Sequence, residues 1–219
     1  MDREFSDGEF IGCLEHAGVL KVVAISRNLE GFKDAKGLRH LVRRWCPSLH
    51  TFFFSVGELT ITLDDVVNNF LPPMFGEENP FDINLSNEDL EVEDKLFNHF
   101  GGRTASPSGK PAKMSKWVMN LSREKDKAVR RVGFLALWLS KFLFSEFLGY
   151  EVKSVFFPLA IRLAQGAQYP LAPCYWAMFT PNWICSTEMK SRVILIMLSL
   201  CLFTVSFSRY SCGSALLLL

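Results

Sequence analysis

The eight residues Val132–Leu139 constrain the fold more than any other segment, because they are apolar on nearly every side of a helix. Such a helix has no face suited to water, so it must lie at the centre of a domain with other elements packed around it. Helix signals flank the segment, since Ser122 suits a helix start and Gly149 suits a helix end. The sequence therefore predicts one long central helix over about 123–148.

The composition agrees with a folded domain around such a helix. The chain has 219 residues, which is enough to bury a sizeable core. Apolar residues make up 49% and charged residues 21%, as in globular proteins, and the 20 phenylalanines supply large side chains for the core. The net charge of +1 indicates no overall attraction to nucleic acid or to an anionic membrane. The six cysteines form no C-x-x-C pair, so we expect no zinc site.

Apolar stripes with start and stop signals predict further helices. Thr62 with Asp65, and Ser86 with Asp89, have the three-residue spacing of capping boxes, in which each side chain satisfies a backbone N–H of the other residue. The helices expected beside the central one are about 38–45, about 63–71, about 87–100 and about 158–165. The segment 10–25 mixes helical and strand-like spacing and is left ambiguous.

One segment has the pattern of strands. Thr51–Phe54 is β-branched and aromatic, Val56–Glu58 suits a turn, and Leu59–Leu63 alternates with period two. This predicts a hairpin over about 51–63 that buries Leu59, Ile61 and Leu63. A Gly-, Ser- and Pro-rich stretch predicts a mobile loop at about 101–113, and Tyr169–Pro173 suggests an extended linker. The expected fold class is mainly α, a helical domain with one small β-hairpin.

Three separated segments carry a resemblance to a known family. Arg44–Phe52 reads RWCPSLHTF and is followed by Gly57–Val66, GELTITLDDV; Phe134–Phe142 reads FLALWLSKF; and Phe157–Gly166 reads FPLAIRLAQG. In this order they resemble the plant mobile domain of MAIN-like ("maintenance of meristems") proteins. The signature residues matched in the first segment are Trp45, His50, Thr51, Phe52, Gly57, Glu58, Thr60, Thr62 and Asp65.

The resemblance implies a non-enzymatic module found in transposable elements and in host nuclear proteins that act with protein partners. It associates such proteins with meristem maintenance, genome integrity and silencing. The family is also called aminotransferase-like, but a pyridoxal enzyme needs a phosphate-binding turn within an α/β scaffold. The sequence shows neither alternating strands and helices nor a Gly-rich strand-to-helix turn. We therefore expect no enzymatic activity and no cofactor.

The family-like pattern weakens near the C-terminus. We assign 1–173 to a partial, C-terminally truncated plant mobile domain and 174–219 to an atypical apolar tail. Within the tail, Val193–Ser208 is free of charge and spans about 24 Å as a helix, less than the roughly 30 Å of a hydrocarbon core. One interpretation is a tail anchor in a membrane. The favoured interpretation is a shifted reading frame or translated intron in a decayed, transposon-like copy.

Two groups of polar residues are candidate sites. Arg123, Lys127, Arg130 and Arg131 would share one face of the predicted long helix, where they can contact phosphates. The interspersed Glu124 and Asp126 favour a solvated helix end instead, so nucleic-acid binding is possible but not favoured. His50, close to Glu58, suggests acid–base chemistry, but structural pairing of the two across the hairpin is the favoured interpretation.

Overall fold

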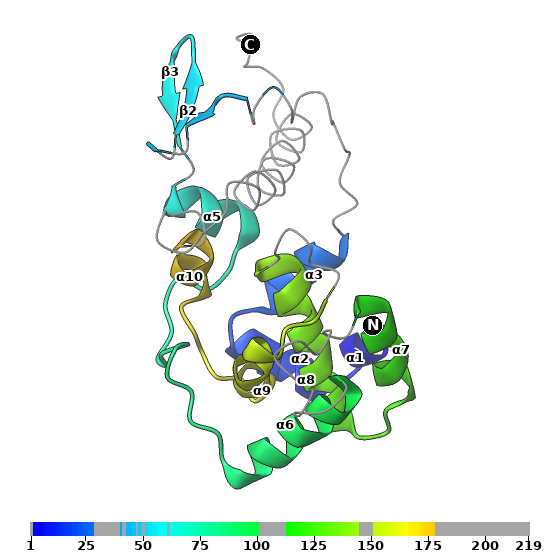
Figure 1. Cartoon of the computed structure of the whole chain (residues 1–219). Helices are drawn as coiled ribbons and strands as arrows, with labels where there is room; N and C mark the ends of the chain where they lie inside the picture. The colour runs from blue at the N-terminus through cyan, green and yellow to red at the C-terminus, as the bar shows by residue number, and fades with distance from the viewer. Residues whose placement is uncertain are drawn as a thin grey trace.

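Helix α8 (Lys127–Trp138) lies at the centre of the molecule, as its sequence predicts (Figure 1). The computed structural model describes residues 2–28, 40, 43–46, 48–49, 51–60, 62–100, 113–144 and 151–177. All eight residues of the Val132–Leu139 segment are buried. Helices α6 (Asn87–Phe100), α7 (Met114–Arg123) and α9 (Phe157–Ala164) pack against α8. The fold is mainly α, which confirms the predicted class.

The predicted long helix over 123–148 is wrong at its start. Ser122 does not open a helix but lies in the last turn of α7, where its Oγ donates to the carbonyl of Met119. The chain leaves helical geometry at residues 124–126 and begins α8 with Asp126 as its N-cap. A single π-helical turn, Leu139–Leu143, follows α8. Residues 145–150, where the predicted helix ends, lie outside the described residues.

A glycine at position 133 favours close packing of α7 on α8. The indole Nε1 of Trp117, on α7, donates to the carbonyl of Gly133 over 3.0 Å. A Cβ atom at Gly133 would lie 2.4 Å from a methyl carbon of Leu121. A side chain at position 133 would require Leu121 to shift, so the glycine lets the two helices pack this closely without moving it.

The ambiguous N-terminal segment is helical. It forms α1 (Asp2–Phe5), α2 (Gly8–His16) and α3 (Leu20–Asn28). The left-handed backbone of Gly18, with φ of 72°, turns the chain between α2 and α3. Phe10 and Leu14 from α2 are fully buried, and α2 packs against α9. The N-terminus thus belongs to the core.

The predicted hairpin is present but shorter, and it belongs to a three-stranded antiparallel sheet. The strands β1 (Trp45–Cys46), β2 (Thr51–Phe54) and β3 (Gly57–Leu59) lie in that order, with Phe52 opposite both Trp45 and Leu59. The turn lies at residues 55–56, so Gly57 and Glu58 are strand residues. The helix predicted over about 38–45 does not include its last residues, because residues 43–44 form a turn and Trp45 is in β1. The rest of that range, apart from residue 40, lies outside the described residues.

The predicted buried face of the hairpin is wrong. Leu59 is 56% exposed, Leu63 is the first residue of the next helix, and Ile61 lies outside the described residues. The buried residue is Phe52, whose ring lies 4.8 Å from that of Trp45. The alternation of apolar residues over 59–63 suggested a longer strand than the chain forms. The strand β3 ends at Leu59, and Thr62 already caps the next helix, α5 (Leu63–Phe70).

Both predicted capping boxes are confirmed. The backbone N–H of Asp65 donates to Thr62 Oγ1 at 3.2 Å, and the N–H of Thr62 donates to Asp65 Oδ2 at 2.8 Å. At the start of α6 the N–H of Asp89 donates to Ser86 Oγ at 3.2 Å, and the N–H of Ser86 to Asp89 Oδ2 at 3.0 Å. Each box therefore fixes the first turn of its helix.

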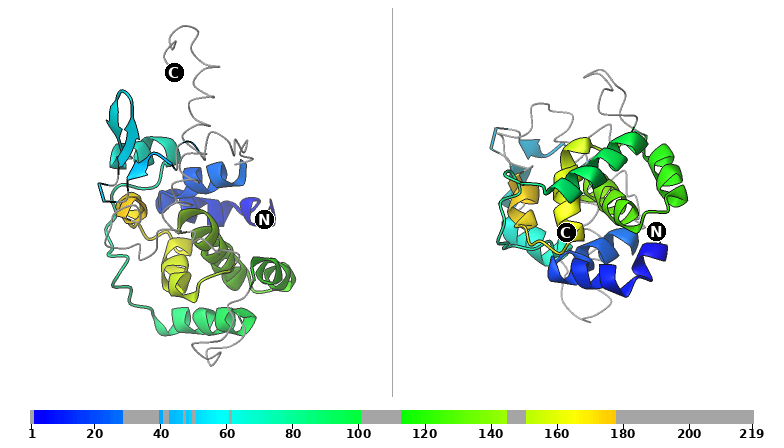
Figure 2. Two further views of the ribbon diagram at one scale, coloured as in Figure 1. Left: turned by 45° about the horizontal axis from the view of Figure 1, so that its top comes forward. Right: turned by 90° about the horizontal axis from the view of Figure 1, so that it is seen from below.

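The C-terminal part of the described chain returns to the sheet end of the molecule. Pro158 lies in the first turn of α9, and Gly166 has φ of 93° just after that helix, as predicted. The extended linker predicted at Tyr169–Pro173 is wrong, because residues Leu171–Ala177 form helix α10. Proline is tolerated in a first helical turn, which is where Pro173 lies. Helices α5 and α10 pack together near the sheet, and α6 lies at the opposite end (Figures 1 and 2).

Candidate functional site

The four basic residues predicted to share one helix face are divided between two helices. Arg123 is the last residue of α7 and is exposed, whereas Lys127, Arg130 and Arg131 lie in the first turns of α8. The predicted common face is therefore wrong. The reason is the helix break at residues 124–126.

Three of these basic residues contact acidic residues of the N-terminal helices. We call this set the N-terminal seam: Glu4, Asp7, Glu9, Lys127, Arg130 and Arg131. Arg131 Nη2 lies 2.6 Å from both Asp7 Oδ2 and Glu9 Oε2, and Lys127 Nζ lies 2.8 Å from Asp7 Oδ2. The Arg131 guanidinium also lies over the ring of Phe10, at 5.5 Å from its centroid. The seam thus joins α1 and α2 to the start of α8.

The seam lowers the pKa of two of its carboxyl groups, those of Asp7 and Glu9. The hydrogen bond from Lys127 and then that from Arg131 hold the pKa of Asp7 far below its ordinary value. The hydrogen bond from Arg131 is the largest cause that lowers the pKa of Glu9. Both carboxylates are therefore ionised at neutral pH. Their negative charges balance the positive charges of Lys127 and Arg131 at the start of α8.

The innermost pair of the seam is Glu4 and Arg130. Both residues are buried, and Arg130 Nε donates to Glu4 Oε1 over 2.7 Å. Arg130 Nη1 also donates to the carbonyls of Glu124 and Lys125, each at 3.3 Å. Arg130 therefore binds both α1 and the loop before its own helix.

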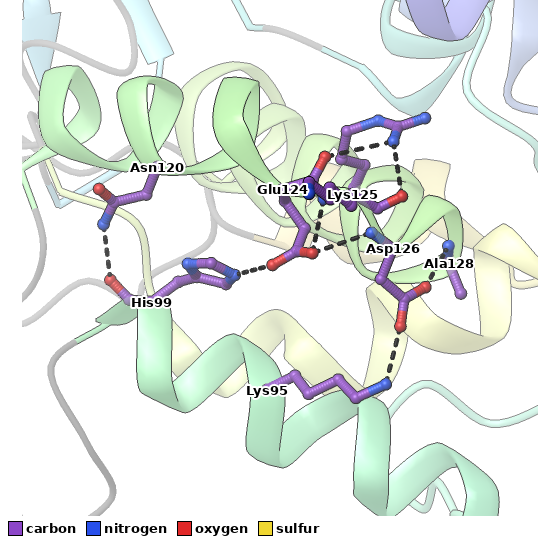
Figure 3. A network of polar contacts seen from close by, with 8 residues as sticks. Lys95, His99, Asn120, Glu124, Lys125, Asp126 and Ala128 are labelled. Atoms are coloured by element: carbon purple, nitrogen blue, oxygen red, sulfur yellow. Dashed lines mark hydrogen bonds and ion pairs between the residues drawn. The ribbon is translucent and has the colours of Figure 1, made fainter.

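The loop between α7 and α8 is held by a second polar network, shown in Figure 3. Glu124 accepts hydrogen bonds from the backbone N–H groups of Lys125 and Asp126, at 2.7 and 2.9 Å, and its Oε2 lies 2.6 Å from His99 Nε2. Asp126 caps α8 through the N–H of Ala128 at 3.0 Å. These contacts end α7 and begin α8.

Side chains from α6 hold this loop in place. Lys95 Nζ lies 2.7 Å from Asp126 Oδ2, and this hydrogen bond lowers the pKa of Asp126 and raises that of Lys95. The pKa of Glu124 is lowered by the N–H of Asp126 and then by His99. The arrangement is a structural clamp made of satisfied hydrogen bonds.

A small pocket lies beside the N-terminal seam. It has a volume of about 190 Å³ and is lined by side chains of α1, α7 and α8: Glu4, Val118, Leu121, Ser122, Arg130, Phe134 and Leu137. One oxygen of Glu4, Oε2, is buried and has no hydrogen-bond partner within the part of the chain that the structure describes. The pocket therefore has mostly apolar walls, and the paired side chains of Glu4 and Arg130 also line it. Sequence reasoning missed this pocket, because Glu4 lies far along the chain from α7.

Comparison with known families decides what kind of domain this is. The family model described as "PMD: Plant mobile domain" matches residues 18–196, which is most of the chain. The chain belongs to the plant mobile domain family. This confirms the resemblance in the sequence and places the chain in a transposon-related family. No curated protein and no solved structure shows a significant match. The family match continues past residue 173, and the boundary predicted there stays a prediction.

The signature residues of this plant mobile domain lie in and after the sheet. Thr51 Oγ1 donates to Glu58 Oε2 over 3.3 Å, and Gly57 has φ of 137°, in the region that favours glycine. Thr60 is exposed. Trp45 packs on Phe52, and Thr62 with Asp65 caps α5. His50 lies outside the described residues, so its predicted pairing with Glu58 stays a prediction.

The part of the plant mobile domain that the structure describes contains no group of three or more His, Cys, Asp or Glu side chains placed to hold a metal ion. Within the same residues no helix is long and apolar enough to cross a membrane. The apolar segment 193–208 lies outside them, and so does the loop predicted at about 101–113 apart from residue 113.

The sheet of the plant mobile domain presents large apolar side chains to solvent. Val56 is 89% exposed at the hairpin turn, and Leu59 and Phe53 are 56% and 42% exposed on the two adjacent strands. The register pairs Phe52 with Leu59 and Phe53 with Glu58, so Leu59 and Phe53 point to opposite faces of the sheet. We call Phe53, Val56 and Leu59 the exposed sheet residues. The sheet lies at the end of the molecule opposite α6 (Figure 1). Sequence reasoning missed the exposure of Leu59 because it placed that residue in the core.

Proposed function

We propose that this plant mobile domain is a non-enzymatic protein-interaction module. The observation that supports the proposal best is the exposure of three large apolar side chains on one small sheet: Val56 at the turn, and Leu59 and Phe53 on opposite faces. Removing such apolar side chains from water is favourable, so a partner that contacts the sheet gains binding free energy from them. Aromatic and aliphatic side chains of this size are the residues that a partner protein most readily buries.

The sheet offers backbone groups beside these side chains. In the described sheet β3 is an edge strand, since the order of the strands is β1-β2-β3. An extended segment of a partner can pair with an edge strand while its side chains cover neighbouring apolar residues. Leu59 lies on β3 itself, so the two kinds of contact would be made together.

The N-terminal seam weighs against nucleic-acid binding through the predicted basic residues. Lys127, Arg130 and Arg131 each hydrogen-bond or pair with a carboxylate of α1 or α2, or of the turn between them. Phosphates would have to displace these carboxylates, which are intramolecular and already positioned. A protein partner therefore remains the favoured class of partner.

The family supplies the biological setting of the proposal. Plant mobile domains are transposon-related, and the sequence resemblance associates the host proteins with the nucleus, meristem maintenance, genome integrity and silencing. We infer a nuclear protein that acts through protein contacts and needs no cofactor. Purified protein is expected to show neither the absorbance of bound pyridoxal phosphate nor turnover of an amino donor, and a lysine-linked aldimine band would contradict this.

A matched pair of substitutions tests the interaction surface. Val56 and Val155 are both highly exposed, at 89% and 72%, but only Val56 lies on the sheet. Tagged full chains with Val56→Asp or Val155→Asp, and the unchanged chain, are compared by affinity capture from plant nuclei with quantitative mass spectrometry. Captured partners are expected to fall at least about tenfold with Val56→Asp and to persist with Val155→Asp. Equal capture by all three chains would show that the sheet is not the surface.

A second candidate function is that of a tail-anchored membrane protein. It is motivated by the charge-free run Val193–Ser208, which follows Lys190 and Arg192. Cell fractionation of the tagged full chain separates the two candidates, because an anchored chain sediments with membranes and resists extraction by high salt. Recovery of the chain in the nuclear fraction would favour the interaction module.

A further inference from the structure

The connection between α5 and α6 carries two phenylalanines whose side chains are largely exposed. We call residues 71–86 the strap, and it runs along one side of the molecule from α5 to α6 (Figure 1). Phe75 is 83% exposed and Phe81 is 72% exposed. A single exposed apolar side chain is common on protein surfaces, so exposure alone indicates no function. What distinguishes Phe81 is the firmly held backbone that carries it.

Residues 79–82 of the strap form a turn that is closed by its own hydrogen bonds, and we call them the strap turn. The backbone N–H of Phe81 donates to Asn79 Oδ1 at 3.0 Å, and the N–H of Asp82 donates to the Asn79 carbonyl at 3.2 Å. Pro80, between them, has a fixed φ. Asparagine favours such a turn, because its side chain can accept from the backbone two residues later. The backbone of Phe81 is therefore held in place while its ring is exposed.

The strap is fixed to the body of the molecule just before this turn. A Cβ atom at Gly76 would lie 2.5 Å from the backbone of Tyr169, so the strap lies directly on that part of the chain. The N–H of Glu78 donates to the Gln168 carbonyl at 3.2 Å. The Glu78 carboxylate accepts from Arg162 Nη2 and from the Tyr169 hydroxyl, each at 2.6 Å. The residue before the turn is thus anchored through both its backbone and its side chain.

The strap is fixed again after the turn. Ile83 and Leu85 are half-buried and pack against the core. Asp89, which forms the capping box of α6 with Ser86, also accepts from Gln165 Nε2 at 2.6 Å. A partner that binds the turn therefore meets a backbone already held on both sides, so that little conformational entropy is lost on binding.

The charge around the turn defines the chemistry of that partner. Residues 71–94 contain eight Asp and Glu residues and no Lys, Arg or His. Glu77 precedes the strap turn and Asp82 ends it, and both are exposed. Lysine or arginine side chains of a partner would be attracted to them, whereas the phosphates of nucleic acid or of an anionic membrane would be repelled. The turn therefore suits a protein that places basic side chains around an apolar pocket.

We propose that the strap turn inserts the Phe81 ring into an apolar pocket of a partner protein whose rim carries lysine or arginine side chains. The pocket removes the ring from water, which is favourable. The basic rim lies opposite Glu77 and Asp82. None of the strap residues belongs to the sheet, so this surface goes beyond the one in the proposed function.

The first test identifies what the Phe81 ring touches. Phe81→benzoylphenylalanine, a photoreactive replacement, is introduced into the tagged full chain, and the crosslinks formed in plant nuclear extract under ultraviolet light are mapped by mass spectrometry. They are expected at apolar residues of a partner protein, with lysine or arginine residues around them in its structure. Crosslinks to nucleic acid, to lipid or to the chain itself, or no crosslink at all, would overturn the proposal.

The second test compares the two exposed phenylalanines. The crosslinked partner is purified, and its affinity for the full chain is measured by isothermal titration calorimetry. Phe81→Ala is expected to weaken binding at least about tenfold, as for an aromatic anchor buried in a pocket. Phe75→Ala, a matched change in the same strap, is expected to leave the affinity unchanged. Equal weakening by the two variants would show that the turn has no special role and refute the proposal.

The third test concerns the turn and the charge separately from the ring. Asn79→Ala removes the side-chain acceptor that closes the turn, and it is expected to weaken binding about three- to tenfold, the effect of one hydrogen bond. The control Asn84→Ala, at an exposed position of the same strap, is expected to have no effect. Added sodium chloride is expected to weaken binding of the unchanged chain, because salt screens the charges of the rim. Failure of either expectation contradicts the proposal.

The Val56→Asp chain separates this inference from the proposed function. The partner crosslinked through residue 81 is expected to bind that chain with unchanged affinity, since Val56 lies at the hairpin turn of the sheet. If no crosslink forms while Val56→Asp still removes partners, the strap turn is refuted and the sheet stands as the interaction surface. If the crosslinked partner is found while Val56→Asp removes none, the strap turn stands and the sheet is refuted.

Discussion

The Arg130 side chain donates to Glu4 across 126 residues of sequence, and this buried ion pair joins the first helix to the central one. A buried charge that loses its partner is strongly destabilising, because neither water nor another group compensates it. By contrast, an apolar replacement of both members of a pair is often tolerated. We therefore expect a single substitution at this pair to lower the free energy of unfolding more than a double apolar substitution does.

Glu4→Leu alone is expected to lower the free energy of unfolding by about 3–5 kcal/mol, since it leaves Arg130 buried without its carboxylate. The double variant Glu4→Leu with Arg130→Met is expected to recover a large part of that loss. Urea denaturation followed by circular dichroism measures both. The control Arg123→Met, at an exposed helix end, is expected to change the stability by no more than about 0.5 kcal/mol. Additive losses in the double variant would show that the two side chains do not act as a pair.

A second prediction concerns acid. The folded pKa of Asp7 is lowered by Lys127 and Arg131, so its contribution to stability is present above the pKa of an unfolded aspartate and is lost as pH falls toward the folded pKa. The urea concentration at the unfolding midpoint is therefore expected to decrease as the pH is lowered from about 5 to about 3, the range around the ordinary aspartate pKa. With Asp7→Asn the midpoint at neutral pH is expected to be lower and its acid dependence weaker.

The control for the acid experiment is Asp82→Asn, which changes an exposed carboxylate in the loop before α6. It is expected to keep the pH dependence of the unchanged chain. If Asp7→Asn and Asp82→Asn give the same profile, the seam does not contribute to acid stability, and the ion pairs at Asp7 have no energetic role.

Much of the fold was predictable where its determinants are close together in sequence. The capping boxes at Thr62 and Ser86 each depend on a partner three residues later, and both were predicted correctly. The burial of Val132–Leu139 was equally evident, because every side of that helix is apolar. Local patterns of this kind need no knowledge of the rest of the chain.

The errors occurred where distant residues decide the local structure. The helix break before α8 depends on Glu124 and Asp126, which are held by His99 and Lys95 of α6. The N-terminal seam depends on acids more than 110 residues away from their partners. The sequence does contain an acidic N-terminus and a basic stretch near α8, but charge alone does not reveal which groups meet. The pocket beside Glu4 was hidden for the same reason.

A third prediction tests how the sheet is anchored. Phe52 is buried against Trp45, whereas Leu59, directly opposite Phe52 in the register, is largely exposed. Phe52→Ala is expected to cost about 3–5 kcal/mol of unfolding free energy, and Leu59→Ala about 0.5 kcal/mol or less. Chemical denaturation of the two variants measures the difference. Equal losses would restore the expectation that Leu59 belongs to the core.

The last prediction concerns alkaline pH at Tyr169, whose hydroxyl donates to Glu78 Oε2 over 2.6 Å. Burial, and then this hydrogen bond, raise the pKa of Tyr169 to about 12. The group is therefore neutral when folded, and its contribution to stability is present below the unfolded pKa of about 10 and is lost as pH rises through the folded value. In the unchanged chain the urea concentration at the midpoint is expected to decrease as the pH rises from about 10, the unfolded pKa, to about 12, the folded pKa. Tyr169→Phe removes the ionisable hydroxyl, so its midpoint should be lower near neutral pH and should fall less steeply in alkali. Tyr175→Phe, on the neighbouring helix α10, is the matched control and should retain the steep fall. A steep alkaline fall that persists in the Tyr169→Phe chain would assign the effect to another group.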